Sequence, residues 1–247
     1  MKSINKAFDI LEVLLVNPDN EQSLSEICES TGLNKSSANR IIAILVNRGY
    51  VSQKEKRGKY ALSTKFLTSS VRIRQYKRIK EIAHPYLVKL GHSVNESIGL
   101  VIRDKNNAYT VDVIPSSNVL TTVFGVGSVL PMYCTSVGKI FLANMTEVEL
   151  EDYLVNIELT KKTEDTITDV SHLKASLKMV KEEGVAYDIE ENWLGVGSVA
   201  VGIYDNSKNI IASIVVVGPY VRLTRGKMSE ILPDIKYCAA EITRVLD

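Results

Sequence analysis

The chain has 247 residues, of which 45% are hydrophobic and 24% are charged, a composition typical of a globular protein rather than a disordered or fibrous one. The longest nearly uncharged apolar run, residues 210–218, is too short to cross a bilayer, and charged residues interrupt the apolar N-terminus, so neither a membrane span nor a secretory signal is expected. The three cysteines are widely separated, with no CxxC pair and no histidine at metal-ligand spacing, which argues against a structural zinc and favours a cytoplasmic protein.

The net charge of +1 hides an asymmetry between the two ends of the chain. Residues 1–80 contain 15 Lys and Arg against 7 Asp and Glu, a net charge of +8, whereas residues 81–247 contain 15 against 22, a net charge of −7. A basic segment followed by an acidic one predicts that the first binds a polyanion and that the second does not.

Three helices are predicted within residues 1–65. The first has apolar residues at helical spacing, namely Ile4, Ala7, Phe8, Leu11, Leu14 and Leu15. Ser23 and Glu26 have the spacing of a capping box and start a second helix, which ends at Gly32, a residue able to take the positive φ of a tight turn. Asn34 then caps a third helix, whose apolar face is Ala38, Ile41, Ile42 and Leu45. Two helices joined by a glycine turn predict a helix-turn-helix.

The residues around the start of the third helix are candidates for DNA contact, because recognition helices meet base edges near this end. Off the apolar face lie Lys35, Ser36, Ser37, Asn39 and Arg40. Asparagine can bond adenine and arginine can bond guanine in the major groove, although contact with phosphate is the alternative for both.

A basic hairpin is predicted directly after this helix. Strand-like residues 50–51 and 60–62 flank a tip that contains Gly58 and the cationic side chains Lys54, Lys56, Arg57 and Lys59. The alternative is a hairpin that is merely exposed to solvent. The position of the hairpin directly after a helix-turn-helix favours a wing that contacts the DNA backbone. We therefore expect a winged helix-turn-helix domain over residues 1–65.

A linker helix is predicted over residues 66–84, in a segment that has no glycine and continues helical to about Leu90. It carries several basic residues, which either contact DNA or are simply exposed to solvent; the sequence leaves both alternatives open. A continuous helix would transmit a change of shape between the two domains.

The acidic part, residues 85–247, has the pattern of an α+β domain. Strands are predicted at residues 97–102 and 109–114, around a turn, with a further strand near 119–124. Helices follow at 136–145, after the capping residue Thr146, and at 171–183, which Gly184 closes. Two more strands, 198–204 and 210–217, precede a C-terminal amphipathic helix.

Known catalytic motifs are absent from the sequence, so no catalytic residue and no metal site is predicted. The Gly195–Gly197 pair leads into a strand rather than out of one, which is the wrong context for a dinucleotide loop. The three histidines are scattered without an evident partner. Asp188, Glu190 and Glu191 have the spacing of paired catalytic carboxylates, but surface charge or ligand contact is the favoured interpretation.

The order of these motifs resembles the IclR family of bacterial transcriptional regulators over nearly the whole chain. The segments that carry the resemblance are KAFDILEVLL from Lys6, LSEICESTGLNKSSANRIIAILVNRGYV from Leu24, LPMYCTSVGKIFLA from Leu130, LTKKTEDTITD from Leu159, and EEGVAYDIEENWLGVGSVAVGIYDNSKNIIASIVVVGP from Glu182. The resemblance implies a GAF-like α/β effector-binding domain that also oligomerises, a small-molecule effector but no cofactor, double-stranded operator DNA as partner, and homodimers or homotetramers.

The resemblance also implies the wall of an effector pocket. Carried over position by position, this wall consists of Leu130, Ser136, Val137, Asp188, Val196, Ser198, Val215 and Val217. Backbone N–H groups at Ser136 and Val137 would hold an anionic group. Family members that bind small keto-acids resemble one another in having Cys at 198 and Ser at 215 and 217, so this chain is expected to prefer a more apolar ligand.

Beside this pocket the family's usual His and Ala are replaced by Tyr133, expected to add a phenolic donor, and Cys134, either a redox sensor or a plain buried thiol. Trp193 could stack on a ligand or simply pack.

The predicted function is that of a one-component transcriptional regulator whose effector alters operator binding. Two other interpretations stay open. One is an enzyme that uses the carboxylates near residue 190, with the basic head as a targeting module. The other is a DNA-binding assembly protein whose C-terminal domain only oligomerises, in which case the pocket should be collapsed.

Overall fold

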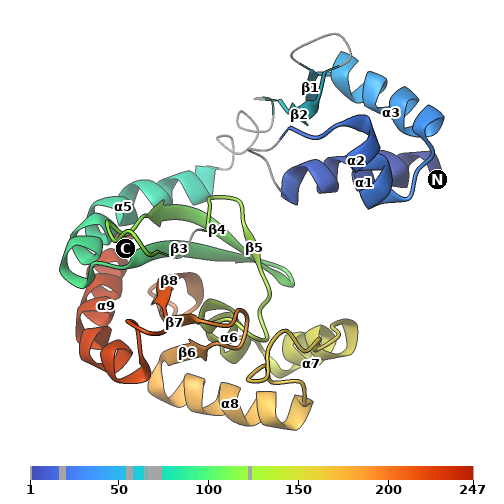
Figure 1. The fold of residues 1–247 in the computed structure, drawn as a ribbon. Helices are drawn as coiled ribbons and strands as arrows, with labels where there is room; N and C mark the ends of the chain where they lie inside the picture. The colour runs from blue at the N-terminus through green and yellow to red at the C-terminus, as the bar shows by residue number, and fades with distance from the viewer. Residues whose placement is uncertain are drawn as a thin grey trace. The chain divides into compact units, whose positions relative to one another are not determined.

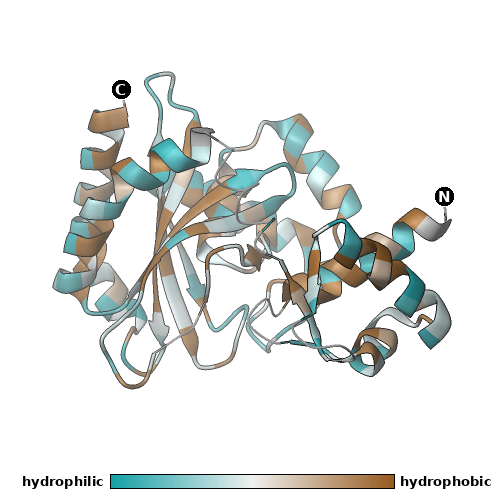
Figure 2. Ribbon diagram, turned by 90° about the horizontal axis from the view of Figure 1, so that it is seen from above, coloured by the Kyte–Doolittle hydropathy of each residue, from teal (hydrophilic) through white to brown (hydrophobic). Residues whose placement is uncertain are grey.

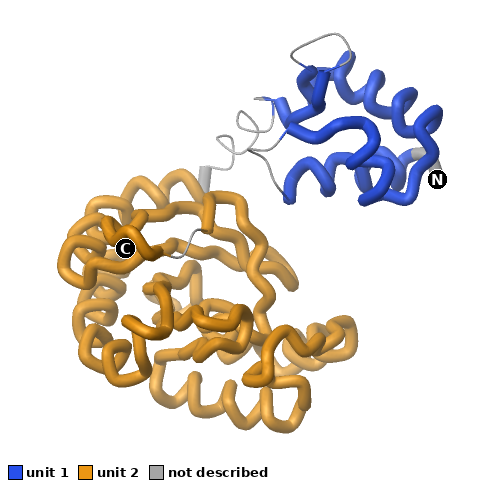
Figure 3. Tube along the Cα trace, viewed as in Figure 1, with its two compact units in different colours: residues 1–74 blue, residues 75–247 orange. Residues whose placement is uncertain are grey.

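The computed structural model describes residues 2–16, 21–53, 58–63, 65, 74–121 and 124–246. They form two compact units, residues 1–74 and 75–247, which Figure 3 colours separately. Each unit has a hydrophobic core of its own.

The first unit is a helix-turn-helix followed by a hairpin (Figure 1). Its elements are α1 (Lys2–Val16), α2 (Leu24–Thr31), α3 (Lys35–Asn47), and the antiparallel strands β1 (Val51–Gln53) and β2 (Tyr60–Leu62). The predicted capping box is confirmed, since Ser23 Oγ accepts from the Glu26 N–H and the Glu26 carboxylate accepts from the Ser23 N–H. Gly32 takes φ 68° in the turn, and Asn34 Oδ1 accepts from the Ser37 N–H at 2.9 Å to start α3.

The predicted apolar face of α1 only partly packs in the core of this unit. Leu14 is the buried residue of that face, whereas Ile4 and Phe8 are about 60% exposed and Leu15 is also exposed. Ile10, which was not part of the predicted face, is fully buried. The helix therefore has a core face and a second, outward apolar face, and the sequence pattern merged the two.

The second unit is a six-stranded antiparallel sheet with helices on both faces (Figure 1). Its strand order is β5-β4-β3-β8-β7-β6. The strands are β3 (Ser97–Asp104), β4 (Asn107–Ile114), β5 (Val129–Leu130), β6 (Val185–Ile189), β7 (Val196–Tyr204) and β8 (Ile210–Pro219). The helices are α5 (Arg74–Val94), α6 (Ser136–Ala143), α7 (Glu147–Asn156), α8 (Val170–Glu183) and α9 (Arg225–Leu246).

The two faces of this sheet bury different cores. The first core lies under α5 and α9 and takes alternate residues of β8, namely Ala212, Ile214 and Val216. The second core lies under α6 and α8 and takes Val215 from the same strand. Figure 2 shows the strands largely in the colours of apolar residues, with α9 alternating between brown and teal. Within the described ranges, no helix is both long and apolar enough to cross a membrane.

The predicted α+β class is confirmed, with two differences among the strands. Residues 119–121 and 124 are irregular rather than a strand, and the short β5 follows instead. Strand β6 was missed because its five residues lie between a helix end and the acidic stretch, which hides their alternation. Residues 66–73 of the predicted linker lie outside the described residues, and the helix is observed from Arg74 onward.

Candidate functional site

The first candidate site is the N-terminal half of α3. Its buried face packs in the core, and the opposite face presents Lys35, Ser36, Asn39 and Arg40 as exposed side chains, with Ser37 half-buried beside the cap. Lys59 on the hairpin is also exposed, whereas Lys54, Lys56 and Arg57 lie outside the described residues. Polar groups thus cluster on one outward surface at the start of the second helix of the motif, where such motifs contact base edges.

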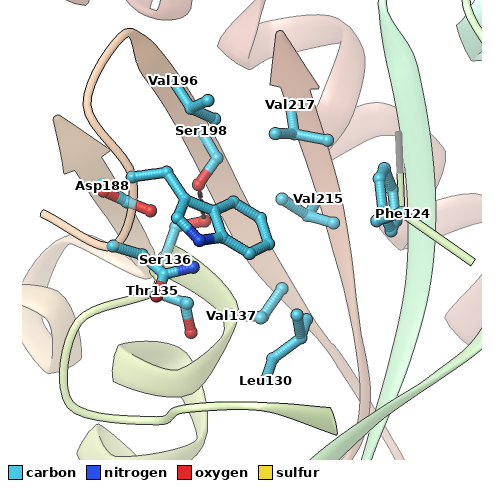
Figure 4. Close-up of a pocket in the computed structure, with 12 residues that line it drawn as sticks. Phe124, Leu130, Thr135, Ser136, Val137, Asp188, Val196, Ser198, Val215 and Val217 are labelled. Atoms are coloured by element: carbon cyan, nitrogen blue, oxygen red, sulfur yellow. Dashed lines mark hydrogen bonds between the residues drawn. The ribbon is translucent and has the colours of Figure 1, made fainter. Parts of the chain in front are cut away.

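The second candidate site is a pocket on the sheet face that α6 covers (Figure 4). It encloses a small cavity of about 40 Å3 that opens to solvent, so its walls do not fill it completely. The structure brings together around it all eight residues of the predicted effector wall, and adds Phe124, Thr135, Asn192 and Trp193.

Strand register explains why distant residues meet in this pocket. Asp188 lies opposite Ser198 on β7, and Ser198 lies opposite Val217 on β8, so the three form one row across adjacent strands. Because side chains alternate along a strand, Val196 and Val215 project on the same face, one row away on either side. In Figure 4 the row runs from Asp188 past Ser198 towards Val217, with Phe124 beyond it.

The N-terminus of α6 forms one side of the pocket, facing the sheet. Thr135 is its cap: Oγ1 accepts from the Gly138 N–H at 3.2 Å and donates to the Pro131 carbonyl at 2.6 Å. The N–H groups of Ser136 and Val137 come first in the helix and therefore have no intrahelical acceptor. Both residues line the pocket, so the positive end of the helix dipole faces the ligand space.

Polar groups gather at one end of the pocket. The Ser136 and Ser198 hydroxyls are 2.6 Å apart and hydrogen-bonded, as the dashed line in Figure 4 marks, and the Asp188 carboxylate lies beside them. Thr135 and Asn192 are the other polar lining residues. Apart from Trp193, the remaining wall is aliphatic or phenyl and comes from Leu130, Val137, Val196, Val215, Val217 and Phe124. This division suits a ligand with one charged or polar group on an apolar body.

Asp188 is a buried carboxylate whose negative charge few neighbouring groups stabilise. Its side chain is 4% exposed, and Oδ1 accepts from the Glu191 N–H at 2.8 Å. Burial raises the pKa of Asp188 to about 7, against the lowering effect of backbone hydrogen bonds from Glu191 and Asn192. At neutral pH this wall of the pocket is therefore poised between its neutral and ionised forms.

A buried cation lowers the pKa of Asp188 but is paired with another acid. Lys139 on α6 is 3% exposed and donates to Glu191 Oε1 in a buried ion pair. Burial still raises the pKa of Glu191, although Lys139 acts in the opposite direction, and Glu191 Oε2 is buried without a hydrogen-bond partner.

The loop that follows β6 is fastened by side chains from elsewhere. Thr163 Oγ1 donates to the Glu190 carbonyl and Thr166 Oγ1 to the Glu191 carbonyl, each at 2.6 Å. Glu190 Oε1 accepts from the Gly195 N–H at 2.6 Å, across a turn in which Gly195 has φ 78°. The Glu190 and Glu191 carboxylates are thus engaged in holding the loop and pairing with Lys139, which does not support the enzyme interpretation.

Beside the pocket, the expectation for Tyr133 is corrected, and one of the two alternatives for Cys134 is favoured. Tyr133 does not line the pocket, because its hydroxyl donates to the Thr160 carbonyl at 2.8 Å. Cys134 is fully buried, its thiol faces Asn192, and burial raises its pKa to about 12. A thiol held in its protonated form is a poor nucleophile, so the structure favours the packing role over the redox role.

The histidine expectation is also corrected in part. His84 on α5 does have a partner, since its Nδ1 lies 2.6 Å from Asp112 Oδ2, while Lys80 Nζ lies 3.2 Å from Asp112 Oδ1. This cluster joins α5 to β4 and lies apart from the pocket wall. Among the described residues, no group of three or more His, Cys, Asp or Glu is arranged to hold a metal ion.

Phe124 is a lining residue that the sequence pattern missed. It was assigned to a strand, but its ring lies against Gly99 on β3, where an added Cβ would come within 2.7 Å of the ring. The signal available in the sequence was Gly99 itself, since a glycine inside a strand marks a close approach of another group.

Comparisons with known proteins match both units. Residues 3–55 match the model of the IclR helix-turn-helix domain, and residues 72–244 match that of the bacterial transcriptional regulator IclR C-terminal domain. The chain is 32% identical to an uncharacterized HTH-type transcriptional regulator of Haemophilus influenzae, over 93% of this chain and 87% of the relative. It is 25% identical to the transcriptional repressor IclR of Escherichia coli, over 98% and 89% of the two chains.

Solved structures give the same similarity. The IclR crystal structure from Thermotoga maritima has 31% identity and a TM-score of 0.74, covering 100% of this chain and 99% of that one. An IclR homolog of Microbacterium hydrocarbonoxydans, complexed with 4-hydroxybenzoate, has a TM-score of 0.81 over 98% of each chain, and at 20% identity it is similar in fold.

Proposed function

Because the chain belongs to the IclR family of bacterial transcriptional regulators, we propose that it binds operator DNA through α3 and the hairpin, and that a small molecule in the pocket under α6 controls this binding. Its relatives are transcriptional regulators rather than enzymes. The observation that supports control by an effector is the pocket itself, polar at one end and apolar over the rest, whose wall unites eight predicted residues from five helices and strands.

In this proposal Asn39 and Arg40 bond base edges, while Lys35, Ser36, Ser37 and the hairpin lysine Lys59 contact phosphates. Lys54, Lys56 and Arg57 belong to the same proposed wing. The chain acts as a homodimer or homotetramer, because such motifs bind paired half-sites, and the outward apolar face of α1 supports an interface of this kind.

Arg40→Ala is expected to weaken binding to an operator selected from random duplexes by about 1–3 kcal/mol, because one bidentate base contact contributes that much discrimination. Binding to unselected duplex should change far less. Arg48→Ala is the matched control: it removes the same charge from the opposite, exposed end of α3. Fluorescence anisotropy of labelled duplexes measures both affinities. Equal losses on selected and unselected DNA would show that Arg40 contacts only phosphate.

The effector half is tested by thermal unfolding of the full chain against a library of metabolites rich in organic and aromatic acids. A ligand at a hundred times its dissociation constant should stabilise the protein by about 2.7 kcal/mol. Val217→Phe, which fills the pocket, should abolish this shift, whereas Val221→Phe, the same change at an 82% exposed site, should not. If no metabolite in the library stabilises the chain, and Val217→Phe unfolds at the same temperature as the wild type, the assembly interpretation would be favoured.

A further inference from the structure

We propose that the pocket binds an anionic effector together with one proton, which resides on Asp188, so that effector binding weakens as the pH rises through neutrality. This inference rests on the proposed effector function and specifies how that site is regulated. It follows from where the negative and positive groups of the pocket lie.

The place for an anion and the Asp188 carboxylate share one end of the pocket. The unpaired N–H groups of Ser136 and Val137 mark the anion's place, because they carry the positive end of the α6 dipole. Ser136 is hydrogen-bonded to Ser198, and Ser198 is directly opposite Asp188 in the sheet. An anion on these N–H groups therefore lies next to Asp188, with two serine hydroxyls beside it and apolar walls around it.

The charged groups around Asp188 offset a second negative charge only in part. From α6, Lys139 lowers the pKa of Asp188 but is itself paired with Glu191, and from the β6–β7 loop the charge of Glu191 raises that pKa. From the segment before α6, the Cys134 thiol is protonated at neutral pH. Farther out, Asp165 acts on Glu191 and Lys162 on Cys134, from the segment that precedes α8.

Two carboxylates in one buried pocket do not both ionise, and the usual outcome is a shared proton. The empty pocket already holds the pKa of Asp188 at about 7, and an adjacent anion raises it further. Below about pH 6 the acid is largely protonated before the ligand arrives, so affinity is constant there. Above pH 7 a proton must be taken up on binding, and affinity falls by up to about tenfold per pH unit.

The experiment uses two probes of one shape, benzoate and its neutral analogue benzamide, titrated calorimetrically into the full chain from pH 6 to 8.5. Each titration is run in two buffers of different ionisation enthalpy, which counts the protons taken up. Benzoate should lose about tenfold in affinity between pH 7.5 and 8.5 with uptake approaching one proton, while benzamide should show neither effect. Asp188→Asn should bind benzoate at every pH as tightly as the wild type does at pH 6, with no uptake.

Glu190→Gln is the matched control, because Glu190 is a neighbouring acid whose carboxylate faces the Gly195 N–H rather than the pocket. It should keep the pH dependence of the wild type. Benzoate binding that is independent of pH, a slope that persists in Asp188→Asn, or no benzoate binding even at pH 6 would each overturn the inference. The proposed function is judged separately, since a neutral metabolite that stabilises the chain at all pH values would leave it standing.

Discussion

Gly138→Ala is expected to lower the free energy of unfolding of residues 75–247 by about 3 kcal/mol or more, which is the upper part of the range for overpacked cores. Gly138 lies in the first turn of α6, fully buried, with its Cα against the chain at Met132. A Cβ there would lie 2.2 Å from Met132 Cα and 2.3 Å from its carbonyl oxygen. Both are backbone atoms, so the contact cannot be relieved by rotating a side chain.

The measurement is denaturant unfolding followed by the fluorescence of Trp193, the single tryptophan of the chain, which lies in this unit. Gly226→Ala, in the first turn of α9, is the control, because its nearest atom is a side-chain oxygen 3.9 Å from the added Cβ. That change should be neutral or stabilise by up to about 1 kcal/mol through helix propensity. A loss at Gly138 no larger than at Gly226 would contradict the close packing of α6 on residues 131–132.

Asp188→Asn is expected to stabilise the same unit by up to about 4 kcal/mol at pH 8, and by almost nothing near pH 4. The pKa of Asp188 rises from 3.8 to about 7 on folding, so the folded protein binds its proton more tightly than the unfolded chain does. The stability that this acid contributes below pH 4 is therefore lost as the pH rises through 7. Asparagine keeps the oxygen that accepts from the Glu191 N–H but never ionises.

Denaturant unfolding of both proteins at pH 4, 6 and 8 measures this effect. Asp205→Asn is a control of opposite sign, because hydrogen bonds from the Asn209 backbone hold the pKa of Asp205 below its usual value. That variant should be less stable than the wild type at pH 8. A constant difference between Asp188→Asn and the wild type from pH 4 to pH 8 would show that Asp188 ionises normally in the folded protein.

Local structure was the part of the fold that the sequence could predict. Ser23, Asn34 and Thr146 start helices, and Gly32 and Gly184 end them, because each acts on backbone groups within four residues of itself. Contacts between distant segments were not predictable in this way. The Lys139–Glu191 and His84–Asp112 pairs join residues 52 and 28 positions apart, and no spacing rule relates them.

The pocket is also built from contacts between distant segments, which local spacing does not predict. Its eight predicted wall residues came from the family resemblance rather than from spacing, because residues such as Ser136 on α6 and Ser198 on β7 meet although 62 positions separate them in the chain. Phe124 was misplaced since its position depends on a glycine in another strand. By contrast, the sequence shows directly that Val215 and Val217 carry no hydroxyl group, and both contribute to the apolar part of the pocket wall.

The threonine hydroxyls that fasten the β6–β7 loop have a kinetic and entropic consequence. With the Glu190 and Glu191 carbonyls held by Thr163 and Thr166, this wall of the pocket is already ordered before any ligand enters. Ordering a residue costs roughly 1–2 kcal/mol of conformational free energy, and here that loss occurs during folding rather than during binding. A small molecule with few contacts therefore loses less of its binding free energy to ordering the protein. The rate at which it enters the pocket is also not limited by closure of this loop.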